Sequence, residues 1–282
     1  MRKPKISVCI PNYNRSDNLH EVLKDCANQS QKAYEIIIQD DSNDRKEISK
    51  INHLIKRFPD VKFRRNKTNL GLAKNVNLVI KRATGDYIVI VNNDDRLSPM
   101  YIERICAFIQ KYPGFNVYTT NACAIEDSGN VRGDYRLFDR NTIIEKGIGI
   151  KDLWKKYFIN LISVSGATIY KKTYLKKNLF RTKYDNESDL DNSLRLLSNE
   201  NIMYIDLPLY YVRMNASNTS VSIRADTTRL NRYISQCIHI YAKYKKNFRN
   251  VPFYMIRPKS IYFLQLTAKH RFDAAACALS ID

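Results

Sequence analysis

The segment Asp86–Pro99, DYIVIVNNDDRLSP, decides the fold. Its first part, Tyr87–Val91, contains only strand-forming residues without polar alternation. This pattern is typical of a strand buried on both faces, as in a parallel sheet covered by helices. Ser98 and Pro99 then predict the N-cap and the first position of a helix. A buried strand that ends in a polar loop and leads into a helix indicates an α/β fold.

Two adjacent carboxylates, Asp94 and Asp95, lie in that polar loop. Like charges at the mouth of a buried strand repel one another and raise each other's pKa unless a cation or a donor lies between them. The pair therefore indicates a site for a divalent metal ion. An isolated Asp-Asp in a loop more often caps a turn, so the pair alone leaves both interpretations open.

The totals indicate a globular protein. A chain of 282 residues is long enough for one large α/β domain and a smaller appendage, and its hydrophobic fraction is 44% with only 8 Gly and 8 Pro. The six cysteines form no CxxC pair, which favours buried free thiols in a reducing cytosol over a zinc site. Since no run approaches eighteen apolar residues, we expect a cytoplasmic protein that does not cross a membrane.

The formal net charge of +19 calls for an anionic partner or a highly solvated surface. Nucleic acid, an anionic membrane surface and an anionic small substrate are the three partners considered. The sequence has no helix-turn-helix, RNP-like or zinc-finger signature, and its lysines are spread over the whole chain. We therefore expect no nucleic acid partner, and a Lys-rich solvated surface remains the alternative explanation.

Strand-like and helix-like segments alternate through the N-terminal half. Right-handed crossovers between them predict a largely parallel sheet with helices on both faces. The expected strands are Ile6–Ile10, Tyr34–Gln39, Val61–Arg64, Tyr87–Val91, Val117–Ala124, Ser163–Tyr170 and Ile202–Arg213. The expected helices carry apolar stripes within Leu19–Cys26 (capped by Asp17), Ile48–Phe58, Val76–Ala83, Ile102–Ile109 and Leu190–Leu197.

Three polar clusters follow three of these strands: Pro11–Arg15, Asp40–Asp44 and Asn92–Asp95. Ligands of open α/β sheets bind outside the carboxyl ends of the strands, so these clusters should line one crevice. This convergence favours a metal and nucleotide site. The absence of GxGxxG, GxxxxGK[ST] and Gly-x-Ser-x-Gly motifs argues against a dinucleotide site, a P-loop and a serine hydrolase.

Four segments together resemble family 2 glycosyltransferases of the GT-A fold. They are SVCIPNYNR (7–15), EIIIQDDSND (35–44), NLGLAKNVNLVIKRATGDYIVIVNNDD (69–95) and ESDLDNSLRLL (187–197). The resemblance extends over residues 5–220. It implies a Rossmann-like, mostly parallel sheet flanked by helices, and an inverting transferase that uses a nucleotide-sugar donor with Mn²⁺ or Mg²⁺.

The resemblance also assigns the donor side. It places Pro11, Tyr13 and Arg15 beside the nucleotide base and Asp40 on the uracil or equivalent ring, with Asp41 close by. The family's Asp-x-Asp metal motif falls on Asn92-Asn93-Asp94, followed by Asp95. Asn92 thus replaces the first carboxylate of this motif. It can still hydrogen-bond a ribose, but it carries no charge. Asp94 becomes the first choice of metal ligand and Asp95 the second, and the strength of the metal dependence stays open.

On the acceptor side, the resemblance places the catalytic base on Asp189, with Glu187 as the alternative if the register slips. Carboxylates there precede a helix, whose dipole favours their ionised form, and plain capping is the alternative for Glu187 and Asp191. Ser165 and Gly166 are candidates for acceptor contacts, against a plain strand with a bulge. Arg213, with Asn215 or Ser217, would meet the diphosphate.

The composition changes after Asp226, where Lys and Arg outnumber acidic residues and alternate with aromatics. Such helices suit an anionic membrane surface, and a packed helical cap is the alternative. We therefore divide the chain into a catalytic domain, 1–222, with a nucleotide half (1–115) and an acceptor half (116–222), and a basic helical region, 223–282.

These observations together predict an inverting transferase that moves a sugar, with UDP the favoured nucleotide, to a glycan or lipid-linked acceptor in cell-envelope polysaccharide assembly. It would lie in the cytoplasm, with peripheral attachment to the inner face of the plasma membrane as an option. Its oligomeric state stays open. The alternatives are a degenerate, non-catalytic sugar-nucleotide binder and, less favoured, a basic nucleic-acid-binding protein.

Overall fold

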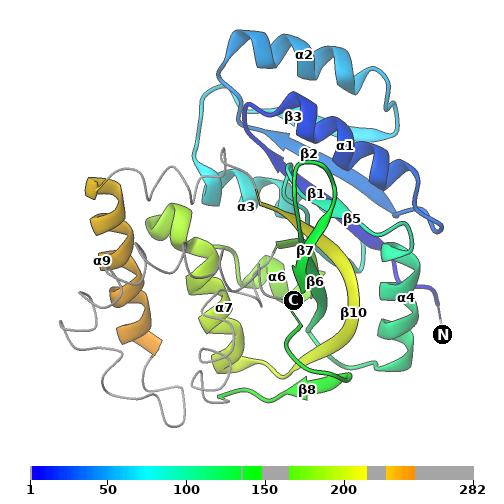
Figure 1. Ribbon diagram of the computed structural model, residues 1–282, viewed down its shortest axis with the longest axis vertical. Coiled ribbons are helices and arrows are strands. Elements are labelled where there is room, and N and C mark those ends of the chain that lie inside the picture. Colours follow the sequence, from blue (N-terminus) through cyan, green and yellow to red (C-terminus); the bar gives the residue numbers. More distant parts are fainter. Residues whose placement is uncertain (1, 135, 148–164, 215–226, 245–282) are drawn as a thin grey trace.

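The structure is a computed structural model that describes residues 2–134, 136–147, 165–214 and 227–244. In this part of the chain ten strands form one sheet with the order β3-β2-β1-β4-β9-β6-β10-β5, while β7 pairs with β6 and β8 with β10. Figure 1 shows helices packed around this sheet.

The strands and helices alternate in the N-terminal half as predicted. The strands are β1 (Ile6–Asn12), β2 (Glu35–Asp40), β3 (Val61–Arg65), β4 (Tyr87–Ile90), β5 (Arg96–Leu97), β6 (Val117–Ile125), β7 (Val131–Asp134), β8 (Thr142–Ile144), β9 (Thr168–Lys171) and β10 (Ile202–Arg213). The helices are α1 (Ser16–Ala27), α2 (Arg45–Ile55), α3 (Leu72–Arg82), α4 (Tyr101–Lys111), α6 (Lys172–Lys177), α7 (Ser188–Asn199) and α9 (Thr227–Tyr244), with short 3₁₀ helices η2 (Ser165–Ala167) and η3 (Thr182–Glu187).

The half of the sheet formed by β3, β2, β1 and β4 is parallel, which confirms the prediction. Beyond β4 the sheet is mixed, because β9 runs antiparallel to both β4 and β6, whereas β6 and β10 are parallel. The carboxyl ends of β1, β2 and β4 therefore meet at one edge.

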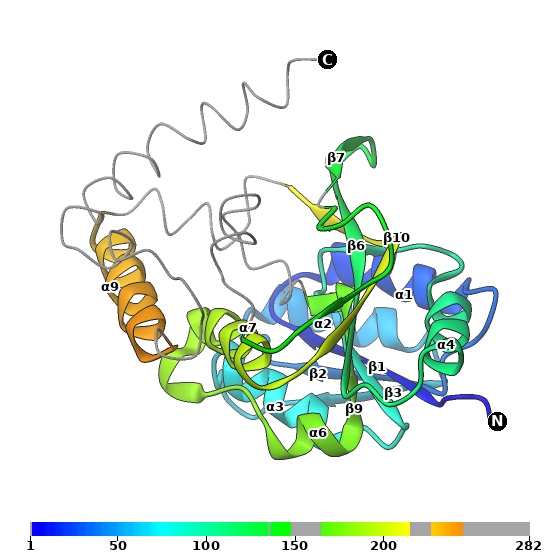
Figure 2. The same ribbon diagram turned by 90° about the horizontal axis from the view of Figure 1, so that it is seen from below.

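Each central strand buries side chains on both faces of the sheet. On β1, Val8 packs into a core with α1, α2 and α4, while its neighbour Cys9 packs into a second core with α3, α6, α7 and α9. Figure 2 shows α1 and α3 on opposite sides of the sheet. Period-two alternation between two apolar layers explains why the strands read as continuous apolar runs.

Two predicted helix starts are wrong. Helix α1 begins at Ser16, and its first backbone amide donates to Glu47 Oε2 (2.7 Å) from α2, so a distant side chain replaces the predicted cap by Asp17. Helix α4 begins at Tyr101, two residues after Pro99. Its N-cap is Met100, whose amide donates to the Ser98 hydroxyl at 3.4 Å, while the Tyr101 amide donates to the Ser98 carbonyl at 3.0 Å. Ser98 therefore belongs to a turn before the helix, and its own N–H donates to Leu209 O (3.0 Å).

The strand predicted for Ser163–Tyr170 is also partly wrong. Residues 163 and 164 lie outside the described residues, Ser165–Ala167 form η2, and β9 begins only at Thr168. Gly166 packs so closely against the Tyr210 ring that a β-carbon there would overlap it, and its carbonyl accepts a hydrogen bond from the Tyr101 hydroxyl. Close packing of the backbone, instead of a strand bulge, accounts for this glycine.

Helix α9 packs on the second core, where Ile240 and Tyr244 are buried beside Leu194 and Leu197 of α7. Figures 1 and 2 both show it beside α7, on the side of the molecule opposite α4. None of the helices within the described ranges is long and apolar enough to span a membrane. The rest of the basic region, 245–282, lies outside the described residues.

Candidate active site

The three strand-end clusters meet, as the topology predicted. Asn12, the last residue of β1, donates from Nδ2 to Asp40 Oδ1 (2.9 Å) at the end of β2. Its Oδ1 accepts from Asn93 Nδ2 (2.6 Å) in the loop after β4. One buried asparagine thus joins the segments that the sequence pointed to, which lie far apart along the chain. Asn12 itself was not among the candidate site residues.

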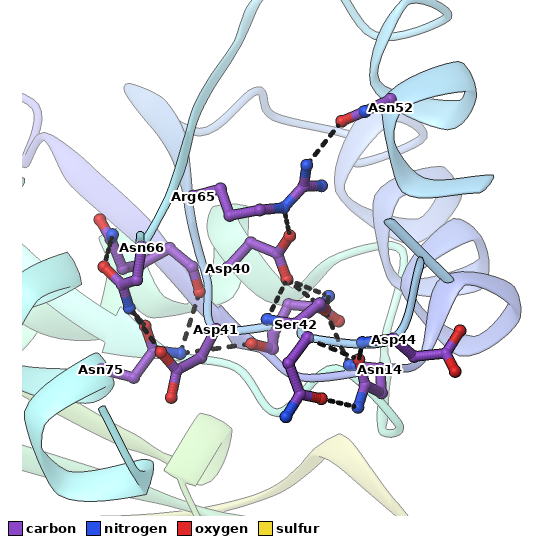
Figure 3. A network of polar contacts seen from close by, with 12 residues as sticks. Asn14, Asp40, Asp41, Ser42, Asp44, Asn52, Arg65, Asn66 and Asn75 are labelled. Carbon is purple, nitrogen blue, oxygen red and sulfur yellow. Dashed lines mark hydrogen bonds and ion pairs between the residues drawn. The ribbon is translucent and has the colours of Figure 1, made fainter. Parts of the chain in front are cut away.

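Asp40 is fully buried and ionically paired (Figure 3). Its Oδ2 accepts from Arg65 Nε at 2.6 Å. Its Oδ1 accepts from Asn12 and from the hydroxyl (2.5 Å) and amide (3.2 Å) of Ser42. Burying a carboxylate is costly unless it is paired, and here four donors hold its charge at the edge of the cleft.

Asp41 holds the start of α3. Its carboxylate accepts from the backbone amides of Leu70 (2.9 Å) and Gly71 (3.0 Å) and from Asn66 Nδ2 (2.8 Å). Gly71 has a φ of 86°, a left-handed conformation that favours glycine. Asn75 reaches back from α3 to the carbonyls of Gln39 (3.0 Å) and Asn12 (3.3 Å). Asp41 therefore fixes the loop before α3, and Figure 3 shows it beside Asn66 and Asn75.

The loop after β1 presents an aromatic ring to solvent. Pro11 is buried within β1, whereas Tyr13 is 46% exposed. Asn14, between Tyr13 and Arg15, has a φ of 47°, and its side chain exchanges hydrogen bonds with Asn43 and accepts from the Asp44 amide. Asparagine tolerates this left-handed conformation, and the turn leaves the Tyr13 ring open to a stacking partner.

Arg15 and Asp94 form an ion pair between the loop after β1 and the loop after β4. Arg15 Nη1 lies 2.5 Å from Asp94 Oδ2, and both side chains are largely buried. The two candidate residues for nucleotide and metal thus lie in direct contact. A cation that binds Asp94 must share or replace this guanidinium.

Asp95 points the other way, into the protein. It is buried and accepts from the Tyr210 hydroxyl (2.5 Å), the Arg213 amide (3.0 Å) and Asn92 Nδ2 (3.0 Å). Burial and the neighbouring Asp94 charge raise its pKa. These bonds tie the loop after β4 to the end of β10. Of the two candidate metal ligands, Asp94 is the more exposed, with 18% of its side chain exposed, whereas Asp95 is 2% exposed.

Arg213 is buried at the end of β10. Its Nε donates to the Asp94 carbonyl (3.0 Å), and its guanidinium forms ion pairs with Glu21 and, at 3.7 Å, with Asp127. These partners hold the residue that the sequence assigned to the diphosphate. The accompanying candidates Asn215 and Ser217 lie outside the described residues.

The residues present fit a cation site that the substrate completes. Within the described residues, no three His, Cys, Asp or Glu side chains gather around one point. Mg²⁺ is usually held by one or two carboxylates together with substrate phosphates and water. The single carboxylate of Asp94, beside the amide side chains of Asn92 and Asn93, is a donor set of this kind.

Glu187 and Asp189 lie at the junction of η3 and α7. Glu187 is the N-terminal flanking residue of α7 and is buried, while Asp189 in the first turn is half-buried and its Oδ1 accepts from the Leu190 amide at 2.6 Å. Asp191 does not have the helix-capping role that was the alternative for it. It is fully buried and forms ion pairs with Arg181 and Lys243.

Sequence reasoning missed the polar side chains that hold these carboxylates and the loops around them. Beside Asn12, the carboxylates are held by Arg65, Asn66 and Tyr210, and Asn75 holds backbone carbonyls at the strand ends. A usable signal was the number of asparagines that directly follow predicted strands or open predicted helices.

Comparisons with known proteins agree with this geometry. A model of the family described as Glycosyl transferase family 2 matches residues 7–179. An uncharacterized glycosyltransferase of Haemophilus influenzae is 24% identical over 278 residues, which cover 95% of this chain and 89% of that protein. The poly(ribitol-phosphate) β-N-acetylglucosaminyltransferase TarP of Staphylococcus aureus is 28% identical over 248 residues, 84% of this chain and 71% of TarP.

A solved structure shares the fold. The crystal structure of S. aureus TarS, residues 1–349, in complex with UDP-GlcNAc superimposes with a TM-score of 0.63 at 18% identity. The match covers 95% of this chain and 77% of that chain. The predicted GT-A fold is thereby confirmed.

Proposed function

The chain belongs to glycosyltransferase family 2, and from this premise we propose that it is an inverting transferase. It moves a sugar from a UDP-sugar to a hydroxyl group of a glycan or lipid-linked acceptor in cell-envelope polysaccharide assembly. The observation that carries the proposal is the contact of Asn12 with both Asp40 and Asn93, because it brings three strand ends into one donor site. TarP, whose name gives poly(ribitol-phosphate) as its acceptor, supports a polymeric acceptor.

The donor side binds the nucleotide through the loops after β1 and β2. Tyr13 offers an exposed ring for the base. Asp40 remains the proposed partner of a base N–H, but its carboxylate is buried and already accepts from Arg65, Asn12 and Ser42, so the base N–H would have to replace one of these donors.

Asp94 would hold a divalent cation, with Asn92 and Asn93 beside it and the diphosphate completing its ligands. Such a cation supplies positive charge to the departing diphosphate. When no cation is bound, Arg15 supplies positive charge to the same region, because its Nη1 lies 2.5 Å from Asp94 Oδ2.

Asp189 acts as the base on the acceptor side. Its carboxylate takes the proton of the acceptor hydroxyl as that oxygen attacks the anomeric carbon, and the bond from this carbon to the diphosphate oxygen breaks with its electron pair on UDP. A positioned base contributes about 10²–10⁴ in rate. Glu187, two residues earlier on the same junction, is the alternative base.

Calorimetry with UDP and Mn²⁺ tests the proposal. A transferase should bind UDP more tightly with Mn²⁺ present and should hydrolyse at least one member of a panel of UDP-sugars. UDP binding without turnover of any member would favour the non-catalytic binder, which the loss of a carboxylate at Asn92 also favours. Failure to bind any nucleoside diphosphate, with or without metal, would overturn both the transferase and the non-catalytic binder.

The basic region that begins at 223 is proposed to keep a cytoplasmic enzyme at an anionic membrane surface. The excess of Lys and Arg with interleaved aromatics supports this placement. Sedimentation with vesicles of anionic and of neutral lipids tests it, since salt-sensitive binding to the anionic vesicles alone is expected. Equal absence of binding to both would leave the region as a packed helical cap.

A further inference from the structure

Asp191 is the centre of a buried ionic cluster outside the donor site. Its Oδ1 accepts from Arg181 Nη1 (2.9 Å), Tyr244 Oη (2.9 Å) and Lys243 Nζ (3.3 Å). Arg181 Nη1 also donates to Tyr244 Oη at 2.8 Å. The side chain of Asp191 has no exposed surface, while those of Arg181 and Lys243 are each 35% exposed. Three segments of the chain therefore converge on one oxygen atom.

The cluster depends on its charge. Burying an isolated carboxylate is costly, and the two cations beside Asp191 offset that cost. Burial and the Asp191 charge raise the pKa of Tyr244 to about 12, which keeps its hydroxyl protonated as a donor. Within the described residues, the second oxygen of Asp191 has no hydrogen-bond partner. Removal of a single donor should therefore loosen all three segments.

Arg181 and Asp191 enclose the segment that carries both candidate bases. Residues 182–190 include η3, Glu187 and Asp189, and the ion pair closes this segment at its two ends. The chain before it is fixed independently, because Phe180 exchanges two hydrogen bonds with Asn77 of α3 (2.8 and 2.9 Å). Both ends of the segment contact α9, because Tyr244 Oη accepts from Arg181 and donates to Asp191.

Helix α9 covers this segment directly. Lys243 lies over the Tyr184 ring of η3 at 5.7 Å from its centroid, and His239 contacts the same ring at 6.3 Å between centroids. Ile240 and Tyr244 are buried in the core beside α7. The last two turns of α9 thus touch η3 by ring contacts and Asp191 by hydrogen bonds.

We propose that α9 is a positioning element of the catalytic site: through Tyr244 and Lys243 it holds Asp191, and with it the η3–α7 junction that presents Asp189 and Glu187 to the acceptor. The catalytic part of this inference rests on the proposed function. Asp191, Tyr244 and Lys243 are positioning residues, since they act through the junction. The basic helical region is then required, through α9, for transfer itself as well as for any surface it binds.

Hydrogen exchange of the full chain, read by mass spectrometry, tests the positioning without any activity. Tyr244→Phe keeps the buried ring and removes the donor, and Lys243→Gln removes the second donor from a partly exposed side chain. Tyr118→Phe is the matched control, because the Tyr118 hydroxyl donates to the Tyr112 carbonyl at 2.8 Å, far from the cluster. We expect peptides within 182–191 to exchange about tenfold faster in both cluster variants and unchanged in Tyr118→Phe.

Donor binding and turnover give the second readout. UDP affinity measured with Mn²⁺ should be equal in all three variants, while kcat for hydrolysis of a UDP-sugar that the unmodified protein turns over should fall about tenfold in Tyr244→Phe and Lys243→Gln alone. Exchange within 182–191 that is the same in both cluster variants as in Tyr118→Phe would overturn the positioning role. Faster exchange in the cluster variants, with no UDP-sugar of the panel hydrolysed even by the unmodified protein, would leave the positioning role intact and count against the proposed function instead.

Discussion

Arg15 Nη1 lies 2.5 Å from Asp94 Oδ2, although 79 positions separate the two residues along the chain. The first residue follows β1 and the second follows β4, and these strands are neighbours in the sheet. A guanidinium thus neutralises the more exposed of the two candidate metal ligands. The cation proposed for Asp94 would therefore compete with Arg15 for Oδ2.

Removal of this guanidinium should strengthen metal binding. In Arg15→Gln, Asp94 loses its counter-ion, so we expect Mn²⁺ to bind the nucleotide-free protein about tenfold more tightly. Titration of Mn²⁺ followed by electron paramagnetic resonance measures this. Arg65→Gln is the control because it removes the same charge from the adjacent Asp40. An equal gain in both variants would indicate a general charge effect and no competition at Asp94.

The exposed ring of Tyr13 should contribute to nucleotide affinity. If it stacks on the base, Tyr13→Ala should weaken UDP binding about tenfold, since stacking of one base on an aromatic side chain contributes about 1–3 kcal/mol. Calorimetry with UDP and Mn²⁺ measures the change. Tyr34→Ala is the matched control, because Tyr34 is 48% exposed against 46% for Tyr13 and lies before β2, at the opposite end of the strands. The same affinity in both variants would contradict the stacking role.

The base assignment is tested by Asp189→Asn. The amide cannot accept the hydroxyl proton, so turnover should fall by about 10²-fold or more while UDP affinity is unchanged. Glu187→Gln is the companion variant, and it should retain most of its turnover. Full activity of Asp189→Asn together with a large loss in Glu187→Gln would move the base to Glu187.

The sequence predicted the strands well because their signal is local. Runs such as Tyr87–Val91 bury both faces, and their apolar residues follow one another directly. The helix starts were less predictable, because the amide of Ser16 is satisfied by Glu47 and Ser98 is held by Leu209. Neither partner is near in sequence, so no capping pattern reveals it.

The sequence predicted where the candidate site lies, but it did not predict most of the hydrogen bonds within it. Strand order alone brought the three polar clusters together. The sequence could not show that Asp95 turns inward to Tyr210, or that Asp191 is held by Lys243 of α9, because each contact joins residues more than fifty positions apart. Glu35 is a further case, since it was predicted only as the start of a strand.

Glu35 should make the stability of the protein depend on pH. Its Oε1 accepts from the Ser7 hydroxyl (2.6 Å) and the Thr84 amide (2.6 Å), and its Oε2 pairs with Lys62 at 2.7 Å. Burial opposes the ionised form, but these bonds outweigh it and lower the pKa to about 2. Because the pKa is lower in the folded state, the ionised carboxylate stabilises the protein above pH 4.5, and this contribution is lost as the pH falls towards 2.

Glu35→Gln should therefore lower the free energy of unfolding by about 1–3 kcal/mol at pH 7. This is less than the full linkage value, because the half-exposed Lys62 is screened by solvent. Denaturant unfolding at pH 7, 5, 4 and 3 measures the difference from the unmodified protein, which should shrink steadily below pH 4.5. Glu145→Gln, at an exposed position, controls for the substitution itself. A difference that stays constant from pH 7 to pH 3 would show that the ionised state of Glu35 contributes nothing, and that the cost comes from the altered hydrogen bonds alone.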